Sequence, residues 1–268
     1  MTSRPIVVGY DASEGAEAAL GWALDEGWRT GAPVLLVYVF EWLGPVGPIP
    51  APRPDDGAER IVSARVGRAR TSHPQVTVAG TVASGPATAV LVDRSEQARL
   101  MVLGSRGHGG FTGLLLGSTS INVSAHAHSP VVVVRQTAAA GDTPVVVGVD
   151  GSACSLLAAD FAFAEAATRK VSLRVLSARP QPAPNGQPPE IQGAVAPLRD
   201  KYPQVSAAID IVDGPAGRVM AEASHDAQLV VVGTRGMGQL RGTLLGSVSQ
   251  QLLHHAHCPV AVVREQPT

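Results

Sequence analysis

The sequence is poor in cysteine, in aromatic residues and in net charge, and each shortage excludes a class of protein. Only two cysteines occur among 268 residues, Cys154 and Cys258, so no disulfide framework can organise the fold. The 21 Lys and Arg residues nearly balance 22 Asp and Glu residues, which leaves a formal net charge of −1. We therefore expect no nucleic-acid partner, because no basic arm or excess of positive charge is present.

Long apolar runs are also missing. No stretch reaches the roughly 20 consecutive apolar residues that a membrane-spanning helix needs. The first apolar run, residues 6–8, begins too early to follow the basic segment of a signal peptide. Together with the scarcity of cysteine, these features predict a protein outside the membrane, in the reducing environment of the cytoplasm.

What the chain does contain is an internal repeat. Two blocks of sequence recur: residues 4–13 as 143–152, and residues 98–136 as 227–265. In the longer block, 21 of 39 positions are identical. A repeat of this length indicates two copies of one domain. We predict a first domain over residues 1–137 and a second over residues 143–268, with a small polar linker between them.

Each copy alternates apolar strands with helices. In the first copy, strands are expected over residues 6–8, 34–40, 76–82, 100–103 and 130–134. Ser13 and Ser118 are expected as N-caps of helices, and Pro86 as the first residue of another. This order predicts an α/β fold of two tandem doubly wound, Rossmann-like domains, each with a five-stranded parallel sheet flanked by helices. In such sheets ligands bind beyond the carboxyl ends of the strands.

A glycine-rich loop follows the fourth strand of each copy and leads into a helix. Its residues are Gly104, Ser105, Arg106, Gly107, Gly117 and Ser118 in the first copy, and Gly233, Thr234, Arg235, Gly236, Gly246 and Ser247 in the second. Glycine permits positive φ and close approach of a ligand, and free amide groups at a helix start favour an anion. The loop is therefore predicted to hold phosphate, with a set of plain tight turns as the alternative.

Two familiar nucleotide motifs are absent from these loops. The phosphate-binding loop of common ATPases needs a lysine at the helix start, and the chain's two lysines, Lys170 and Lys201, lie elsewhere. No Gly-x-Gly-x-x-Gly opens the first helix, which excludes a dinucleotide fingerprint. Arg106 and Arg235 stand inside the loops instead, either to neutralise phosphate or as solvated loop charges.

Two further repeated features carry titratable groups. Asp11 and Asp150 follow the first strand of each copy, where a carboxylate can hydrogen-bond a ribose, hold a phosphate-bridging Mg²⁺, or simply close its own turn. His-Ala-His recurs at residues 126–128 and 255–257. A helix-end role against the dipole is favoured over a metal there, so no metal site built from protein side chains alone is expected.

Taken together, the Gly-x2-Gly-x9-Gly-Ser loops, the opening strand that ends in Gly-x-Asp and the closing Ala-His-x-Pro-Val-x-Val-Val-Arg segment resemble the ATP-binding branch of the universal stress protein family. The resemblance implies that Gly9, Asp11 and the backbone of Val39 meet the ribose, phosphate and adenine of ATP, with Mg. The matching positions of the second copy are then Gly148, Asp150 and Ser177, besides the two loops. Ser177 departs from the apolar residue of the family pattern, which predicts weaker adenine binding there.

Three functions follow as alternatives. The first is a regulator or stress-response factor that holds ATP with little or no hydrolysis; the downstream protein partner is unknown. The second is an adenine-nucleotide-dependent transferase or slow ATPase of the same fold group. The third is a structural module with vestigial glycine loops.

The closing strands bear on assembly. Residues 131–134 and 260–263 are apolar throughout, and the resemblance places such strands at sheet edges, where they need cover. We therefore predict an intramolecular pseudo-dimer built around residues 131–135 and 260–264. A homodimer between chains would use a different surface.

Overall fold

The structure is a computed structural model, and it describes residues 3–40, 56–107, 116–135, 142–179, 191–236 and 245–265. Its contacts divide the chain into two compact units, Met1–Ser129 and Pro130–Thr268. The predicted linker lies mostly outside the described residues, and so does the proline-rich stretch after residue 40. The domain bounds 1–137 and 143–268 stay a prediction.

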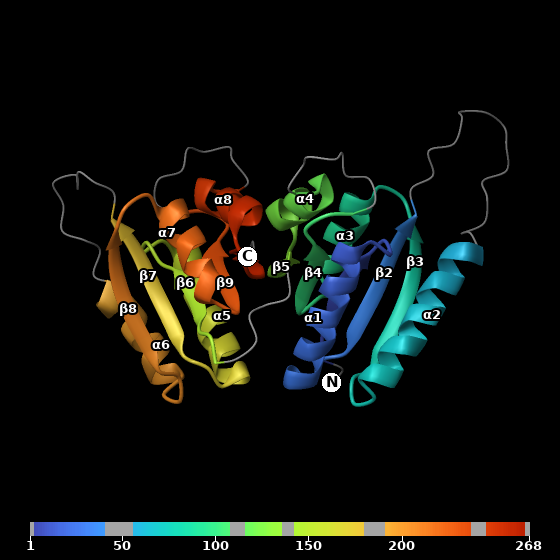
Figure 1. Ribbon diagram of the computed structural model, residues 1–268, viewed down its shortest axis with the longest axis horizontal. Helices are drawn as coiled ribbons and strands as arrows, with labels where there is room; N and C mark the ends of the chain where they lie inside the picture. Colours follow the sequence, from blue (N-terminus) through green and yellow to red (C-terminus); the bar gives the residue numbers. More distant parts are fainter. Residues whose placement is uncertain are drawn as a thin grey trace. The chain divides into compact units, whose positions relative to one another are not determined.

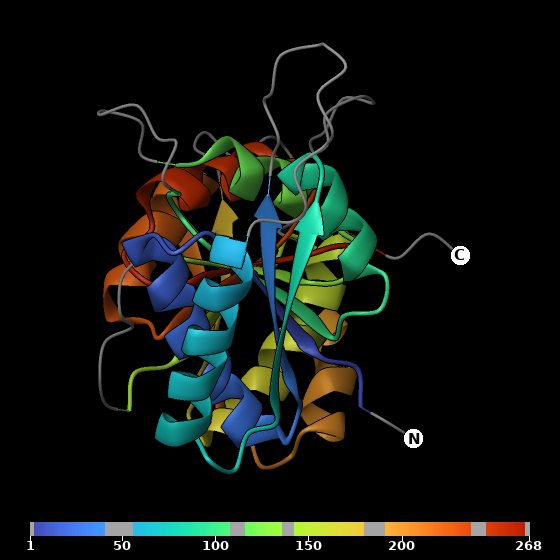
Figure 2. The same cartoon turned by 90° about the vertical axis from the view of Figure 1, so that its right-hand side faces the viewer.

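The first unit contains a parallel sheet with helices on both faces. Its elements are β1 (Ile6–Tyr10), α1 (Glu14–Thr30), β2 (Val34–Phe40), α2 (Asp56–Ser72), β3 (Val78–Ser84), α3 (Ala87–Ser95), β4 (Leu100–Gly104) and α4 (Ser118–His126). The strands lie in the order β3-β2-β1-β4, and every pair is parallel. Helices α1 and α2 cover one face of this sheet, and α3 lies on the other (Figure 1 and Figure 2).

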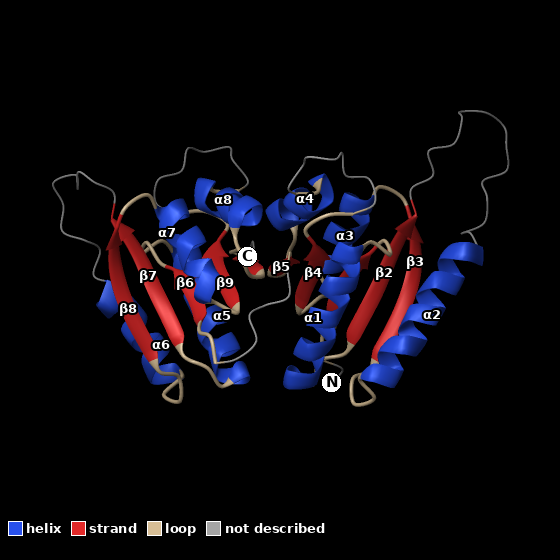
Figure 3. Ribbon diagram, viewed as in Figure 1, coloured by secondary structure: helices blue, strands red, loops and turns tan. Residues whose placement is uncertain are grey.

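The second unit repeats this arrangement. Its elements are β5 (Val131–Val134), β6 (Val145–Gly148), α5 (Ala153–Arg169), β7 (Leu173–Arg179), α6 (Ile191–Lys201), β8 (Ala207–Asp213), α7 (Ala216–Ala223), the 3-10 helix η1 (Ser224–Asp226), β9 (Leu229–Gly233), α8 (Ser247–His255) and β10 (Val260–Val263). Five parallel strands run in the order β10-β9-β6-β7-β8 (Figure 3). The predicted α/β class with a parallel sheet flanked by helices is confirmed.

The closing strands β5 and β10 pair with each other inside the second unit. The pairing is antiparallel, with Val260 opposite Val133 and Val262 opposite Val131. All eight side chains are buried. Arg135 then donates hydrogen bonds from Nη1 to the carbonyl oxygens of Leu253 and His254 at the carboxyl end of α8, where a cation is favoured. This pairing explains how the two apolar strands avoid exposure. The pseudo-dimer predicted around residues 131–135 and 260–264 stays a prediction.

The starts of the helices agree only in part with those predicted from the sequence. Ser13 caps α1 as predicted, since its Oγ accepts a hydrogen bond from the Ala16 amide at 3.1 Å. Two expectations are wrong. Pro86 is the N-cap of α3 and not its first residue, and Gly117 is the N-cap of α4, which leaves Ser118 as the first residue inside that helix. Helix α3 thus begins one residue after its predicted start, and α4 begins one residue before it.

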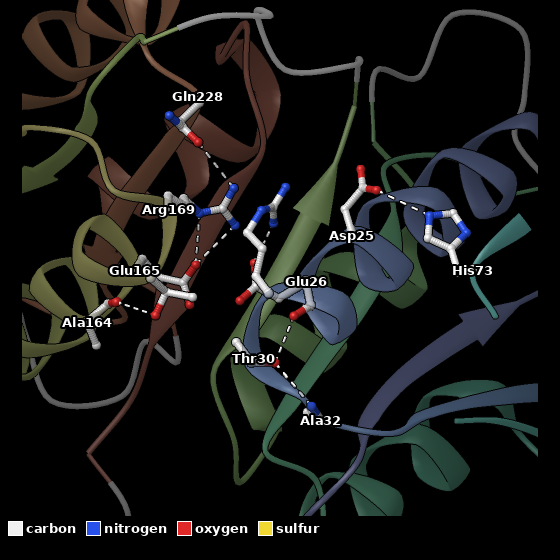
Figure 4. A network of polar contacts seen from close by, with 11 residues as sticks. Asp25, Glu26, Thr30, Ala32, His73, Ala164, Glu165, Arg169 and Gln228 are labelled. Atoms are coloured by element: carbon white, nitrogen blue, oxygen red, sulfur yellow. Dashed lines mark hydrogen bonds and ion pairs between the residues drawn. The ribbon is translucent and has the colours of Figure 1, made fainter. Parts of the chain in front are cut away.

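Polar contacts fix the carboxyl ends of the first helix in each unit (Figure 4). In the second unit, Arg169 donates from Nε to Glu165 at 3.1 Å and from Nη1 to the Gln228 side chain at 3.3 Å. In the first unit, the Thr30 hydroxyl donates to the Glu26 carbonyl at 2.7 Å. These contacts anchor α1 and α5 at the end of the sheet opposite to the glycine loops.

Candidate functional site

The first unit has a pocket of about 460 Å³ at the carboxyl ends of its strands, beside the start of α4. Eight of the nine residues predicted for this copy line it: Gly9, Asp11, Val39, Gly104, Arg106, Gly107, Gly117 and Ser118. The ninth, Ser105, is buried beneath the loop, where its carbonyl accepts a hydrogen bond from the Gly117 amide at 2.8 Å. Segments more than 100 residues apart in sequence thus meet in one hollow of the size that small-molecule sites have.

Gly104 and Gly107 are glycines because other parts of the protein lie too close to them for a side chain, and not because their backbone angles are unusual. Among the described glycines, positive φ occurs only at Gly31, Gly85, Gly151 and Gly214, so the described glycines of the loops do not use the positive φ that glycine permits. A Cβ on Gly104 would lie 2.4 Å from the carbonyl carbon of Gly15, at the start of α1. A Cβ on Gly107 would lie 2.4 Å from Oδ2 of Asp11. These two glycines let the loop pack directly on the turn after β1.

Gly117 differs from Gly104 and Gly107, because the described residues leave room for a side chain there. Of their atoms, the nearest to a Cβ at this position is the Ser105 carbonyl oxygen at 3.6 Å, an ordinary contact distance, and φ is −76°. No side chain of the described residues caps α4 at Gly117. The first amide groups of the helix therefore open onto the pocket, where the helix dipole favours an anion.

A serine missed by the sequence reading holds this helix in place. The Ser120 hydroxyl donates to the carbonyl of Gly104 at 2.7 Å, and in the second copy Ser249 makes the same bond to Gly233 at 2.7 Å. The bond ties the first turn of the helix to the end of the neighbouring strand. Its recurrence in the aligned repeat was the available signal, but serine near a helix start is too common to single out.

The charged groups of the pocket are Asp11 and Arg106. Asp11 closes its own turn through Oδ1, which accepts a hydrogen bond from the Ser13 amide at 3.0 Å, while the carboxylate also lines the pocket. Arg106 is exposed at the rim, and its backbone carbonyl accepts a bond from the Ser13 hydroxyl at 3.2 Å. The turn role of Asp11 and a ligand role are therefore compatible, because they involve different parts of one carboxylate.

The other half of the pocket is apolar, and most of it was not foreseen. Val37, Leu91 and Leu103 line it together with Val39, so an apolar ring has a surface to pack against. Tyr10 lines it too, with its hydroxyl bonded to Glu17, which in turn accepts from Arg65 Nε at 2.7 Å. Burial, the Glu17 hydrogen bond and the Glu17 charge raise the pKa of Tyr10 to about 12. The phenol therefore remains protonated and fixes the end of β1.

The second unit has the equivalent pocket, with a smaller volume of about 210 Å³. Seven of the nine residues predicted for this copy line it: Gly148, Asp150, Gly233, Arg235, Gly236, Gly246 and Ser247. Thr234 is buried, as is its counterpart Ser105, and its carbonyl accepts a bond from the Gly246 amide at 2.7 Å. Asp150 again closes its turn, with Oδ1 3.0 Å from the Ser152 amide. The two glycine loops are therefore built alike.

Ser177 requires a correction. It does not line the second pocket, where Leu176 and Ala178 stand instead. Gly9 pairs with Val37 and Gly148 with Leu176, which makes Ala178 the counterpart of Val39. The alignment was one residue out, and successive side chains of a strand point to opposite faces. Ser177 is buried elsewhere, so it gives no reason to expect weak binding.

The cysteine and histidine pairs take no part in these pockets. Both thiols are free and buried, and burial raises the pKa of Cys258 to about 12, which leaves it an unreactive thiol. In the described parts of the chain, no group of three or more His, Cys, Asp or Glu side chains is arranged to hold a metal ion. Within the same residues, every helix is too short or too polar to cross a bilayer.

Comparison with known proteins places the chain in a family. The family model for the universal stress protein family matches residues 2–135 and again residues 143–264, so the chain belongs to this family and carries two of its domains in tandem. Universal stress protein Rv2623 of Mycobacterium tuberculosis is 34% identical over 296 residues, which cover 100% of this chain and 98% of the relative. A universal stress protein of Mycolicibacterium smegmatis is 32% identical over 293 residues, covering 98% of each.

A solved structure supports the fold. The crystal structure of a universal stress protein from Archaeoglobus fulgidus covers 98% of this chain and 99% of its own, with a TM-score of 0.75 and 18% sequence identity. Such a match extends over both copies and confirms the tandem Rossmann-like architecture. The family to which the glycine loops pointed is confirmed by the family model and by the relatives in mycobacteria.

Proposed function

We propose that this protein is a nucleotide-dependent regulator or stress-response factor that holds ATP in its first pocket, and in its second, with little or no hydrolysis. The observation that carries the proposal is the convergence of eight expected residues on one pocket of about 460 Å³. One half of that pocket offers main-chain amides and an arginine to phosphates, and the other offers an apolar surface to a base. An adenine nucleotide matches both halves.

Magnesium fits the phosphate half as part of the nucleotide. Asp11 in the first pocket and Asp150 in the second each bring one carboxylate beside the loop. Mg²⁺ is commonly held by one or two carboxylates together with phosphate oxygens and water, so the donor set is suitable. When bound, the ion would neutralise phosphate charge. Asp11 and Asp150 would orient it, and Arg106 or Arg235 would supply further positive charge.

Retention of the nucleotide is favoured over fast turnover. Among the described residues, the titratable side chains that line the first pocket are Tyr10, Asp11 and Arg106. Tyr10 is engaged by Glu17, and Asp11 is engaged by the turn that it closes. An orienting role suits both groups better than abstraction of a proton from water. We expect the nucleotide to alter contacts with a cytoplasmic protein partner or with a second chain.

The experiment is mass spectrometry of the ligand released from full-length protein that was purified without added nucleotide, followed by steady-state turnover with ATP. We expect adenine nucleotide at up to two per chain and turnover far below the 1 s⁻¹ that is the lower end of common enzymes. Protein that releases no nucleotide and binds none when ATP is added would contradict the proposal. Fast turnover would instead establish the transferase or ATPase alternative.

A further inference from the structure

The second unit contains another hollow, of about 370 Å³, that shares no lining residue with the nucleotide pocket. It lies between α7, η1 and α8. Its lining residues are Arg218, Ala221, Glu222, His225, Gln251, His255 and His257. Three of these seven are histidines and one is an arginine, a composition that the nucleotide-binding function does not require.

The same positions in the first copy carry a different charge. An offset of 129 residues aligns Arg218 with Ala89, His225 with Glu96 and Glu222 with Asp93. His255 and His257 align with His126 and His128. With the histidines neutral, the first copy therefore has two negative charges here, while in the second copy Arg218 and Glu222 cancel. With the histidines protonated, the second copy alone becomes positive, by three charges.

The contacts show that only side-chain chemistry has changed. The amide of His257 donates to the Ser224 hydroxyl at 2.9 Å, and that of His128 donates to the Ser95 hydroxyl at 2.8 Å. On this common scaffold, His128 Nε2 lies 3.9 Å from a Glu96 oxygen in the first unit. In the second unit, the rings of His225 and His257 stack with their centroids 3.6 Å apart. A contact between a histidine and a carboxylate in the first unit thus corresponds to a pair of histidines in the second.

The groups around the stack determine how it takes up protons. On α7, Glu222 accepts from Arg218 Nε at 2.9 Å, which leaves no net charge from that pair at neutral pH. Asp226 follows His225 on η1, His254 and His255 end α8, and Arg135 acts on His257 from the end of β5. Burial, then the charges of His225 and Arg135, lower the pKa of His257. His257 is therefore neutral at pH 7, and its protonation below pH 6.5 adds repulsion that a bound anion would relieve.

We propose that the hollow lined by Arg218, His225, His255 and His257 is an oxyanion site, for sulfate or a phosphate group, that fills on acidification. Two stacked imidazolium rings repel each other, and an anion held between them and Arg218 offsets that repulsion. Binding of the anion and protonation of the histidines are then coupled, so each promotes the other to the same extent. The site lets this family member sense acidity through a surface apart from its ATP pockets.

Sulfate is the first probe, because its charge stays constant from pH 8 to pH 5. Histidine ring signals of the full-length chain are followed by NMR from pH 8 to pH 5, in sulfate and in chloride of equal ionic strength. We expect sulfate to raise the titration midpoints of His225 and His257 by about 0.5 pH unit or more, as a charge partner does. Phosphoserine serves as a second probe; a larger shift with it would assign the site to phosphate monoesters.

The matched variant is His225→Glu, which installs the residue of the first copy and should abolish the sulfate effect on His257. Arg218→Ala is a second variant, and it should not disturb folding because the Arg218 side chain is 73% exposed. It should reduce the sulfate-induced shift of the His257 titration midpoint by at least half. Glu96→Gln in the first copy is the control and should leave the shift at His257 unchanged. Equal midpoints in sulfate and chloride, or a shift that survives both variants, would overturn the proposal.

Discussion

The two candidate pockets share the half formed by the glycine loop and differ in their apolar half. In both, the loop glycines, one arginine and the uncapped start of a helix occupy the same positions. In the apolar half, Leu176 stands where the first copy has Val37, and Ala178 where it has Val39. The volumes are about 460 and 210 Å³. The loop half of the pocket, with its main chain and its polar side chains, is kept in both copies, whereas the apolar side chains have diverged.

The difference has a direct consequence for binding. Met220 replaces Leu91, and its unbranched chain places Sδ and Cε 3.2 Å from a Cβ built on Gly148. A volume of about 210 Å³ lies below the roughly 300 Å³ at which sites for drug-sized ligands begin, so the second pocket has less room for a whole nucleotide than the first. Any rearrangement needed to admit ATP would subtract from its affinity. We therefore expect both sites to bind phosphate but the first to bind ATP more tightly.

The largest expected effect is a loss of folding stability when a methyl group is added where the glycine loop packs most closely on the first helix of each unit. Gly104→Ala would bring Cβ to 2.4 Å from the Gly15 backbone, whereas Gly233→Ala would bring it to 2.9 Å from the Cys154 backbone. Overpacking of this kind costs about 3 kcal/mol in the first case and about 1 kcal/mol in the second. Urea unfolding of the two variants measures the difference. An equal loss of unfolding free energy in the two variants would show that the two loops do not differ in packing.

A second variant separates ligand contact from folding. Gly117→Val adds a side chain where the nearest protein atom is 3.6 Å from Cβ, so unfolding free energy should change by less than about 1 kcal/mol. ATP affinity at the first site should fall by roughly thirtyfold, about 2 kcal/mol, because the side chain occupies the phosphate approach. Equilibrium dialysis with labelled ATP measures this. Unchanged affinity would mean that the cradle is misassigned.

Exchanging one apolar residue between the pockets sharpens the comparison further. Leu176→Val should raise the affinity of the second site for ATP by roughly tenfold, because one methylene group in a pocket changes affinity by about that factor. Val37→Leu should lower the affinity of the first site for ATP by a similar factor. Each is measured in a background where the other site is silenced, by Gly117→Val or Gly246→Val. Shifts in the same direction for both exchanges would show that pocket volume does not control affinity.

The smallest effect concerns the turn after the first strand. Ala12 has φ of 66°, a conformation that costs a residue other than glycine about 1 kcal/mol, and its counterpart is Gly151 with φ of 88°. Ala12→Gly should stabilise the first copy, and Gly151→Ala should destabilise the second by a similar amount. Thermal unfolding of both variants tests this. If both variants changed the unfolding temperature in the same direction, the turn would have to relax to accommodate the substitution.

The sequence predicted best what depends on repetition and on the main chain. The tandem α/β fold and the convergence of Gly104, Gly117 and Asp11 on one pocket followed from motif spacing, because strand ends of a parallel sheet meet at one edge. Helix starts were misplaced by one residue at Pro86 and Ser118, since proline and serine are both frequent at neighbouring cap positions.

The side chains that line the apolar half of each pocket were harder to predict from the sequence. The error at Ser177 came from matching the second strands at an offset of 138 residues, although the offset of 139 found at the first strands continues through them. A shift of one residue turns a strand side chain to the other face. Val37 and Leu91 looked like ordinary core residues, since lining a pocket and filling a core require the same apolar side chains. The pairing of Tyr10 with Glu17 and Arg65 joins three elements, and no spacing in the sequence indicates it.

The central claim, that each copy holds one adenine nucleotide and the first holds it more tightly, is tested most directly by calorimetric titration of ATP with Mg into the nucleotide-free full-length chain. The account predicts two sites per chain whose dissociation constants differ by about tenfold or more, with Gly117→Val removing the tighter site and Gly246→Val the weaker. The absence of binding heat at several temperatures, or a single site that survives Gly117→Val, would contradict it.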